Sequence, residues 1–137
     1  MSLFRVFDIS GSALRAQTAR LNTTASNMAN ADSISSSTGQ TYRARQPVFA
    51  AQLDAAGSDG EAAGVDVLGI VESQAPLRRE YRPDHPLSDS QGYVNLPNVN
   101  PVEEMANMIS ASRSYQSNVE VLNTSKQMLT RTLSLGD

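Results

Sequence analysis

The residues that could carry acid–base or nucleophilic chemistry are concentrated in one short segment. His85, the single histidine of the chain, stands between two prolines, and Ser88 and Asp89 follow it. A Ser–His–Asp triad needs its three groups to converge beside donors for an oxyanion. Residues this close together in a proline-bounded segment rarely adopt that geometry, and the chain has no Gly-x-Ser-x-Gly elbow. We therefore expect a turn in which His85 bonds nearby backbone, with a hydrolase that uses His85 as the less favoured alternative.

Composition argues against other reactive sites. The chain has no cysteine, which excludes a thiolate nucleophile and a cysteine-based zinc site, and one histidine excludes a multi-histidine metal site within one chain. Glu103 and Glu104 are adjacent, and adjacent helix positions point about 100° apart, so we expect them to interact with the helix dipole. The 11 basic and 14 acidic residues form no basic patch, which argues against nucleic acid as a partner. We predict no catalytic, cofactor-binding or metal-binding residue.

The overall composition indicates a protein that completes its burial against other subunits. Its 137 residues predict one domain. Hydrophobic residues make up 39% of the chain and aromatic residues 5%, tryptophan is absent and the net charge is only −3, so we do not expect a thick, self-sufficient core. No apolar run approaches the ~18 residues of a membrane-spanning helix. The first residues lack the basic and apolar regions of a cleaved signal peptide.

A long helix is predicted within residues 1–34. Large apolar residues recur there every seven positions, at Phe7, Leu14, Leu21 and Met28. The positions four later are mostly small, namely Gly11, Thr18, Ala25 and Asp32, which would let a partner helix approach closely. Near the end of this helix we expect the amides of Asn27 and Asn30 to bond backbone groups and contact the next subunit, with simple helix termination as the alternative.

A second, longer helix is predicted within residues 100–137. Asn100 suits the N-cap, Pro101 the first helical position, and Glu103 the capping box. Gly136 is placed to end the helix, giving a rod of roughly 50 Å. A second seven-residue series, widened by two further apolar residues, comprises Met108, Tyr115, Leu122 and Leu129 together with Met105 and Val119.

Residues 35–99 predict a β-rich middle region. Five prolines forbid long helices there. Short β-like runs occupy 42–49, 65–71, 77–81 and 93–96, and about 52–64 reads as a mobile loop. We interpret Arg78 and Arg79, with Glu80, as a solvated strand face or an inter-subunit ion pair. The predicted fold class is mainly α with a β insertion, in which the N- and C-terminal helices pair as an antiparallel coiled coil.

Several segments resemble flagellar axial proteins, the family of rod, hook and hook-associated proteins. The run Leu21–Ser33, LNTTASNMANADS, carries the Asn-x-Ala-Asn core of their N-terminal signature. The ending Ala31–Ser33, the segments Tyr81–Pro86, Gly92–Val94 and Pro97–Asn100, and the run Val102–Gln116 continuing to Glu120–Asn123 resemble the proximal rod members in particular.

The resemblance implies a structural subunit of the proximal rod of the basal body, which transmits torque from the motor ring to the distal rod and hook. It also implies export without a cleaved signal peptide through the flagellar type III apparatus, and assembly in the periplasm. The implied partners are other rod proteins, the adaptor between rod and membrane ring, and further copies of this chain. A cytoplasmic coiled-coil adaptor is the alternative. The expected subunit-interface residues are Asn27, Asn30 and the apolar residues Phe7, Leu14, Leu21, Met28, Met105, Met108, Tyr115, Val119, Leu122 and Leu129.

Overall fold

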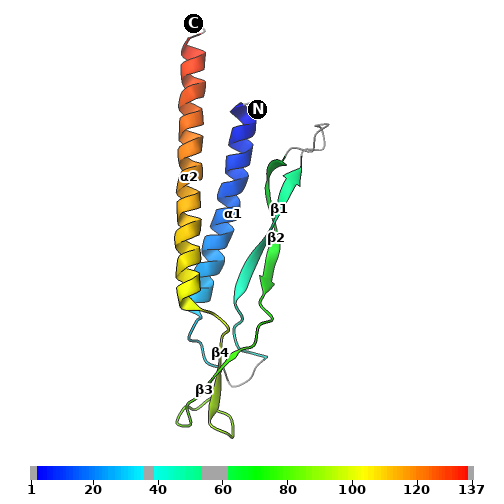
Figure 1. The fold of residues 1–137 in the computed structure, drawn as a ribbon, viewed down its shortest axis with the longest axis vertical. Helices are drawn as coiled ribbons and strands as arrows, with labels where there is room; N and C mark the ends of the chain where they lie inside the picture. The colour runs from blue at the N-terminus through cyan, green and yellow to red at the C-terminus, as the bar shows by residue number, and fades with distance from the viewer. Residues whose placement is uncertain (1–2, 36–38, 54–61, 136–137) are drawn as a thin grey trace.

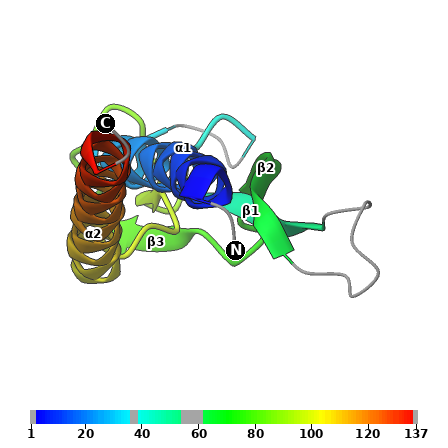
Figure 2. The ribbon, with the colours of Figure 1, turned by 90° about the horizontal axis from the view of Figure 1, so that it is seen from above.

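Two long antiparallel helices and two β-hairpins make up the protein (Figure 1). The structure is a computed structural model, and it describes residues 3–35, 39–53 and 62–135. The elements in chain order are α1 (Leu3–Ala29), β1 (Arg45–Leu53), β2 (Ala62–Glu72), β3 (Arg78–Tyr81), β4 (Tyr93–Leu96) and α2 (Pro101–Ser134). This arrangement confirms the predicted fold class. Seen from above, α2 and the β1–β2 hairpin lie on different sides of α1, which contacts both (Figure 2).

Helix α2 begins where the capping residues predict. The side chain of Asn100 accepts hydrogen bonds from the backbone N–H groups of Val102 and Glu103, and Pro101 occupies the first helical position. These bonds satisfy donors that the first helical turn leaves unpaired. At the other end, the Leu135 N–H bonds the Arg131 carbonyl at 3.1 Å. Gly136, the predicted terminator, lies outside the described residues.

The buried column of α1 differs from the predicted one. The residues four positions after the large apolar series are exposed from Thr18 onward, at Thr18, Ala25 and Asp32. The residues three positions after it are buried or half-buried instead, at Ser10, Gln17, Thr24 and Ala31. In a helix with 3.6 residues per turn, both +3 and +4 lie beside a given residue, and the elements packed on α1 decide which becomes buried.

The two hairpins occupy the predicted β-like runs with shifted ends. β1 pairs antiparallel with β2, and the register changes between Val48 and Phe49, opposite the extra residue Leu68. β3 pairs antiparallel with β4 from Arg78–Leu96 to Tyr81–Tyr93. The strands reach further into the predicted loop 52–64 than its composition suggests, and its centre, residues 54–61, lies outside the described residues.

The core is thin and lies where the helices join the hairpins. A small cluster of Ala31, Ala44 and Val99 is buried there, with Tyr42 packed against it. Val94 and Leu96 of β4 are also buried. Most of these side chains are small, so the apolar area removed from water is limited, as the composition predicts.

Candidate subunit interface

Asn27 fastens the end of α1 to the start of β1. Its Nδ2 donates to the Arg45 carbonyl at 2.8 Å, and its Oδ1 accepts the Arg45 N–H at 2.8 Å and the Tyr42 hydroxyl at 2.9 Å. The side chain is only 1% exposed. The amide therefore bonds backbone groups as predicted, but its polar atoms are already engaged within the protomer. Asn30 donates to the Ser26 carbonyl at 2.8 Å and so closes the last turn of α1.

Two further side chains, for which the sequence predicted no such role, complete this joint. Asn98 accepts the Ala44 N–H at 2.8 Å and donates to the carbonyls of Ser73 and Ala75. Arg78 donates to the carbonyls of Ala31 and Pro97, each at 3.1 Å. Each side chain thus ties together segments far apart in the sequence. Nothing in the local sequence around Asn98 signals this role, because its partners are backbone groups brought near by the fold.

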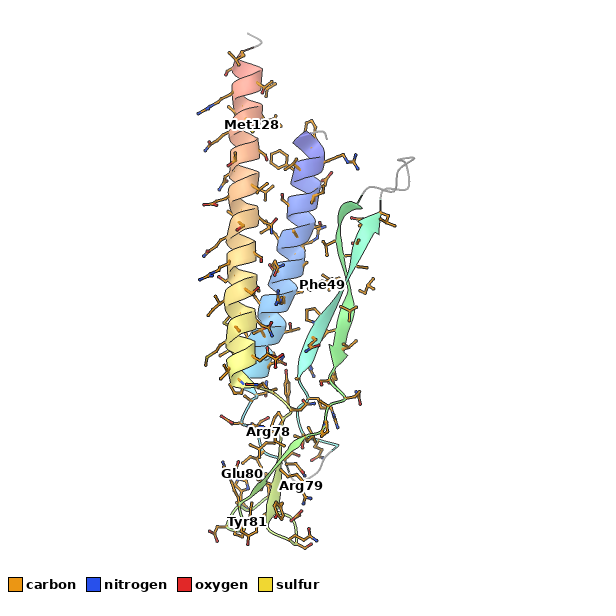
Figure 3. The ribbon with its side chains drawn as sticks, viewed as in Figure 1. Phe49, Arg78, Arg79, Glu80, Tyr81 and Met128 are labelled. Carbon is orange, nitrogen blue, oxygen red and sulfur yellow. The ribbon has the colours of Figure 1, made fainter. Side chains whose placement is uncertain are left out.

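The charges of the β3–β4 hairpin are paired inside the protomer. Arg79 bonds Asp89 at 2.8 Å and lies over the Tyr93 ring, and Arg82 bonds Glu80 at 3.1 Å. All four residues of β3 are exposed, so the predicted solvated strand face is confirmed, and the inter-subunit ion pair stays a prediction. Figure 3 shows Arg78, Arg79, Glu80 and Tyr81 along this hairpin.

The segment with the candidate triad forms a turn. His85 accepts the Leu87 N–H on Nδ1 at 3.1 Å, and the Ser88 hydroxyl is directed to the Pro83 carbonyl at 3.4 Å. Asp89 accepts the N–H groups of Gln91 and Tyr93, each at 2.9 Å. The Tyr93 N–H lowers the pKa of the Asp89 carboxyl, and Arg79 acts in the same direction. The three side chains have separate partners, which confirms the predicted turn and removes the geometric basis for a hydrolase.

The predicted interface residues on the two helices are mostly half-buried within the protomer. Those of the seven-residue series on α1, together with Met108, Val119, Leu122 and Leu129 on α2, are half-buried. Met105 and Tyr115 are exposed. A hydrogen bond of 3.0 Å from Arg20 to Asn107 fixes the antiparallel register. It places Leu21 near the beginning of α2, roughly 20 Å from the level of Leu122, so the two leucines are not opposite one another.

The β1–β2 hairpin carries an apolar surface that the sequence interpretation did not assign to the interface. Ile70 and Val71 are exposed to more than half, and Leu68 at the bulge to 68%. Phe49 is also exposed and lies between β1 and the helices (Figure 3). Exposed apolar surface of this extent is typical of a contact surface. The near-continuous apolar run of residues 67–71 is the signal that could have revealed it.

Metal-binding clusters and membrane-spanning helices are absent from the described part of the chain. Residues 3–35, 39–53 and 62–135 contain no group of three metal-binding side chains. Within the same ranges no helix has the length and apolar character needed to cross a membrane.

Comparison with known proteins decides the family. A family model described as "Flagella basal body rod protein" matches residues 7–33, and one described as "Flagellar basal body rod FlgEFG protein C-terminal" matches residues 90–135. The flagellar basal-body rod protein FlgC of Salmonella typhimurium is 57% identical over 137 residues, which cover 99% of each chain. The chain belongs to the FlgC family of flagellar basal-body rod proteins.

Other members of the FlgC family show a similar relationship. FlgC of Escherichia coli O157:H7 is 56% identical over 136 residues, and FlgC of Yersinia enterocolitica is 55% identical over 136 residues, again over 99% of each chain. One family model matches most of α1. The other matches the end of the turn before β4, then β4 and α2. The protein is therefore a structural subunit of the flagellar basal-body rod and not an enzyme.

Proposed function

We propose that this rod subunit acts in the proximal rod, within the periplasm, and transmits torque from the motor ring to the distal rod and hook. The observation that carries the proposal is the hydrogen-bonded joint of Asn27, Arg78 and Asn98 between the helices and the hairpins. A subunit that transmits torque must resist relative motion of its parts, and directional bonds to backbone groups resist bending better than a thin apolar core.

The surface of the protein supports assembly with other rod components. Large apolar side chains stay exposed on the β1–β2 hairpin and on α2, among them Ile70, Val102 and Ile109. We infer that α1 and α2 pack into the inner tube of the rod. The predicted interface residues on these helices contact neighbouring copies and other rod proteins. The adaptor between rod and membrane ring, and the type III export apparatus, are the further partners; export proceeds without a cleaved signal peptide.

A complementation experiment tests this proposal. A strain that lacks the gene receives the wild-type gene with an epitope inserted at the exposed residue Gly39, where an added Cβ atom would meet nothing within 4 Å. Basal bodies are then purified, and the periplasm and cytoplasm are fractionated. We expect restored swimming, the epitope in basal bodies, and a mature protein that keeps its first residues. Swimming cells whose epitope is confined to the cytoplasm would support the alternative of a cytoplasmic adaptor.

A further inference from the structure

Tyr42 lies where the parts of the joint meet. Its side chain packs against the small buried cluster that brings together the end of α1, the approach to β1 and the approach to α2. Its hydroxyl oxygen lies 2.9 Å from Asn27 Oδ1 and 3.2 Å from Ser26 Oγ, both on α1. The guanidinium of Arg45, at the start of β1, lies over its ring, 5.3 Å from the ring centre. One side chain therefore contacts every segment that the joint connects.

Only one arrangement of the hydroxyl protons satisfies both polar contacts of Tyr42. The amide oxygen of Asn27 cannot donate, so the Tyr42 proton lies on the bond to Asn27. Ser26 must then donate to Tyr42. The Arg45 N–H donates to the same Asn27 oxygen at 2.8 Å. A chain of hydrogen bonds thus runs from Ser26 through Tyr42 to the oxygen that holds β1, and bonds in such a chain strengthen one another.

This chain of bonds fixes the orientation of the Asn27 amide. The amide accepts the Arg45 N–H and donates to the Arg45 carbonyl at 2.8 Å, which are the two bonds that a residue of a neighbouring antiparallel strand would make. Both bonds require one orientation of the amide group. Tyr42 holds the amide oxygen from a second direction, and the Asn27 side chain is only 1% exposed, so water does not readily replace a bond that it loses.

We propose that Tyr42 is the positioning residue of the joint: its hydroxyl holds the Asn27 amide in the orientation that fastens the edge of β1 to α1. The inference rests on the proposed function in the rod and deepens it, because it names the group on which the stiffness of the joint depends. The contact between the Arg45 guanidinium and the Tyr42 ring does not involve the hydroxyl. Removing the oxygen alone therefore separates positioning from packing.

Tyr42→Phe is the variant that removes the hydroxyl and keeps the ring. Hydrogen exchange of the purified full-length protein is followed by NMR at the amides of Arg45 and Val65. The Val65 N–H is bonded to Ser12 Oγ, at the other attachment of the hairpin to α1. We expect the Arg45 amide to exchange about fivefold faster, as the loss of one net hydrogen bond implies, and the Val65 amide to keep its rate. Equal acceleration at both amides would indicate a general loss of stability and overturn the positioning role.

Tyr93→Phe is the matched control. The Tyr93 ring also lies beneath an arginine, and its hydroxyl has no hydrogen-bond partner within residues 3–35, 39–53 and 62–135. This change should leave exchange at Arg45 unaltered. An unchanged Arg45 amide in the Tyr42→Phe variant, or the same acceleration in both variants, would contradict the proposal.

A double variant tests whether Tyr42 acts through Asn27. Adding Tyr42→Phe to Asn27→Ala should not accelerate exchange at Arg45 any further, because the oxygen that the phenol holds is already absent. A further fivefold acceleration would show that Tyr42 acts independently of Asn27 and would overturn the proposal. All of these measurements use the free protein. Absence of the protein from basal bodies would refute the function in the rod and leave the exchange results standing, so the two failures are distinguishable.

Discussion

Gly64 of β2 lies directly against Ser12 of α1. A Cβ atom added to Gly64 would lie 2.7 Å from the Ser12 hydroxyl oxygen and 3.3 Å from its Cβ. The same hydroxyl accepts the Val65 N–H at 3.0 Å and donates to the Ile9 carbonyl at 2.7 Å. The β1–β2 hairpin is therefore held at backbone distance from the helix pair at a point well away from the joint at the base.

Replacing Gly64 by alanine is expected to push the hairpin away from α1. The nearest atoms belong to a serine that is 2% exposed and hydrogen-bonded, so it has little room to move. We expect a loss of about 1–3 kcal/mol in the free energy of unfolding, measured by urea denaturation followed by circular dichroism. Gly39→Ala is the control, because a Cβ there meets nothing within 4 Å. Equal effects of the two changes would show that hairpin packing on α1 adds little stability.

Asn27→Ala should weaken the joint between α1 and β1. The change removes three hydrogen bonds and leaves the N–H and carbonyl of Arg45 without these partners. We expect a loss of roughly 1–3 kcal/mol and faster amide exchange at Arg45, measured by hydrogen exchange. Asn22→Ala, an exposed asparagine of the same helix, should change both quantities little. Unchanged exchange at Arg45 in the Asn27 variant would contradict the assigned role.

Leu122→Asp is expected to prevent rod assembly while export continues. Leu122 is half-buried, and a carboxylate there loses hydration when the helices pack, at a cost on the order of several kcal/mol in the assembled rod. Swimming in soft agar and an immunoblot of the periplasmic fraction measure the two effects. The adjacent exposed residue gives a matched control, Asn123→Asp.

His85→Ala should be much milder than the change at Leu122. It removes one bond, from the Leu87 N–H to Nδ1, worth about 1 kcal/mol, so partial swimming should remain. A motile Leu122→Asp strain, or assembled but immotile rods in the His85→Ala strain, would argue against a purely structural role for these residues.

The turn at the tip of the β3–β4 hairpin should loosen in acid. The Tyr93 N–H bond lowers the folded-state pKa of Asp89 below its ordinary value of 3.8. A carboxyl group whose pKa is lower in the folded than in the unfolded state stabilises the folded state at pH values above its unfolded-state pKa. This contribution is lost as the pH falls through the folded-state pKa. We expect the Tyr93 amide resonance to titrate below pH 3.8.

Asp89→Asn should abolish that titration, because the amide oxygen still accepts the Tyr93 N–H but carries no charge. Asp84→Asn, in the same hairpin tip, serves as the control and should leave the titration intact. A Tyr93 amide that titrates equally in the Asp89→Asn variant would assign the pH dependence to another group.

Local sequence signals are sufficient to predict the helices and strands and the residue at which α2 begins. The seven-residue apolar series predicts both helices, and Asn100–Pro101 predicts the start of α2 because a cap bonds only groups within its own first turn. Proline positions and β-branched runs likewise located the four strands to within a few residues. The two prolines around His85 predict a turn, and the structure confirms it because the bonding partner of His85, the Leu87 N–H, is only two residues away.

The contacts between elements required the tertiary structure. Ser10 and Thr24 are buried, and Thr18 and Ala25 are not, because of where α2 and the β1–β2 hairpin pack on α1. The level of Leu122 along α1 depends on the Arg20–Asn107 register. Asn98 and Arg78 bond carbonyl groups, which every residue type carries, so no pattern of side chains in the sequence identifies their partners. The sequence by itself determined which segments become helix, strand and turn, because those preferences act over a few residues. Only the folded chain decided which faces are covered and which backbone groups Asn98 and Arg78 bond, because these depend on groups far apart in the sequence.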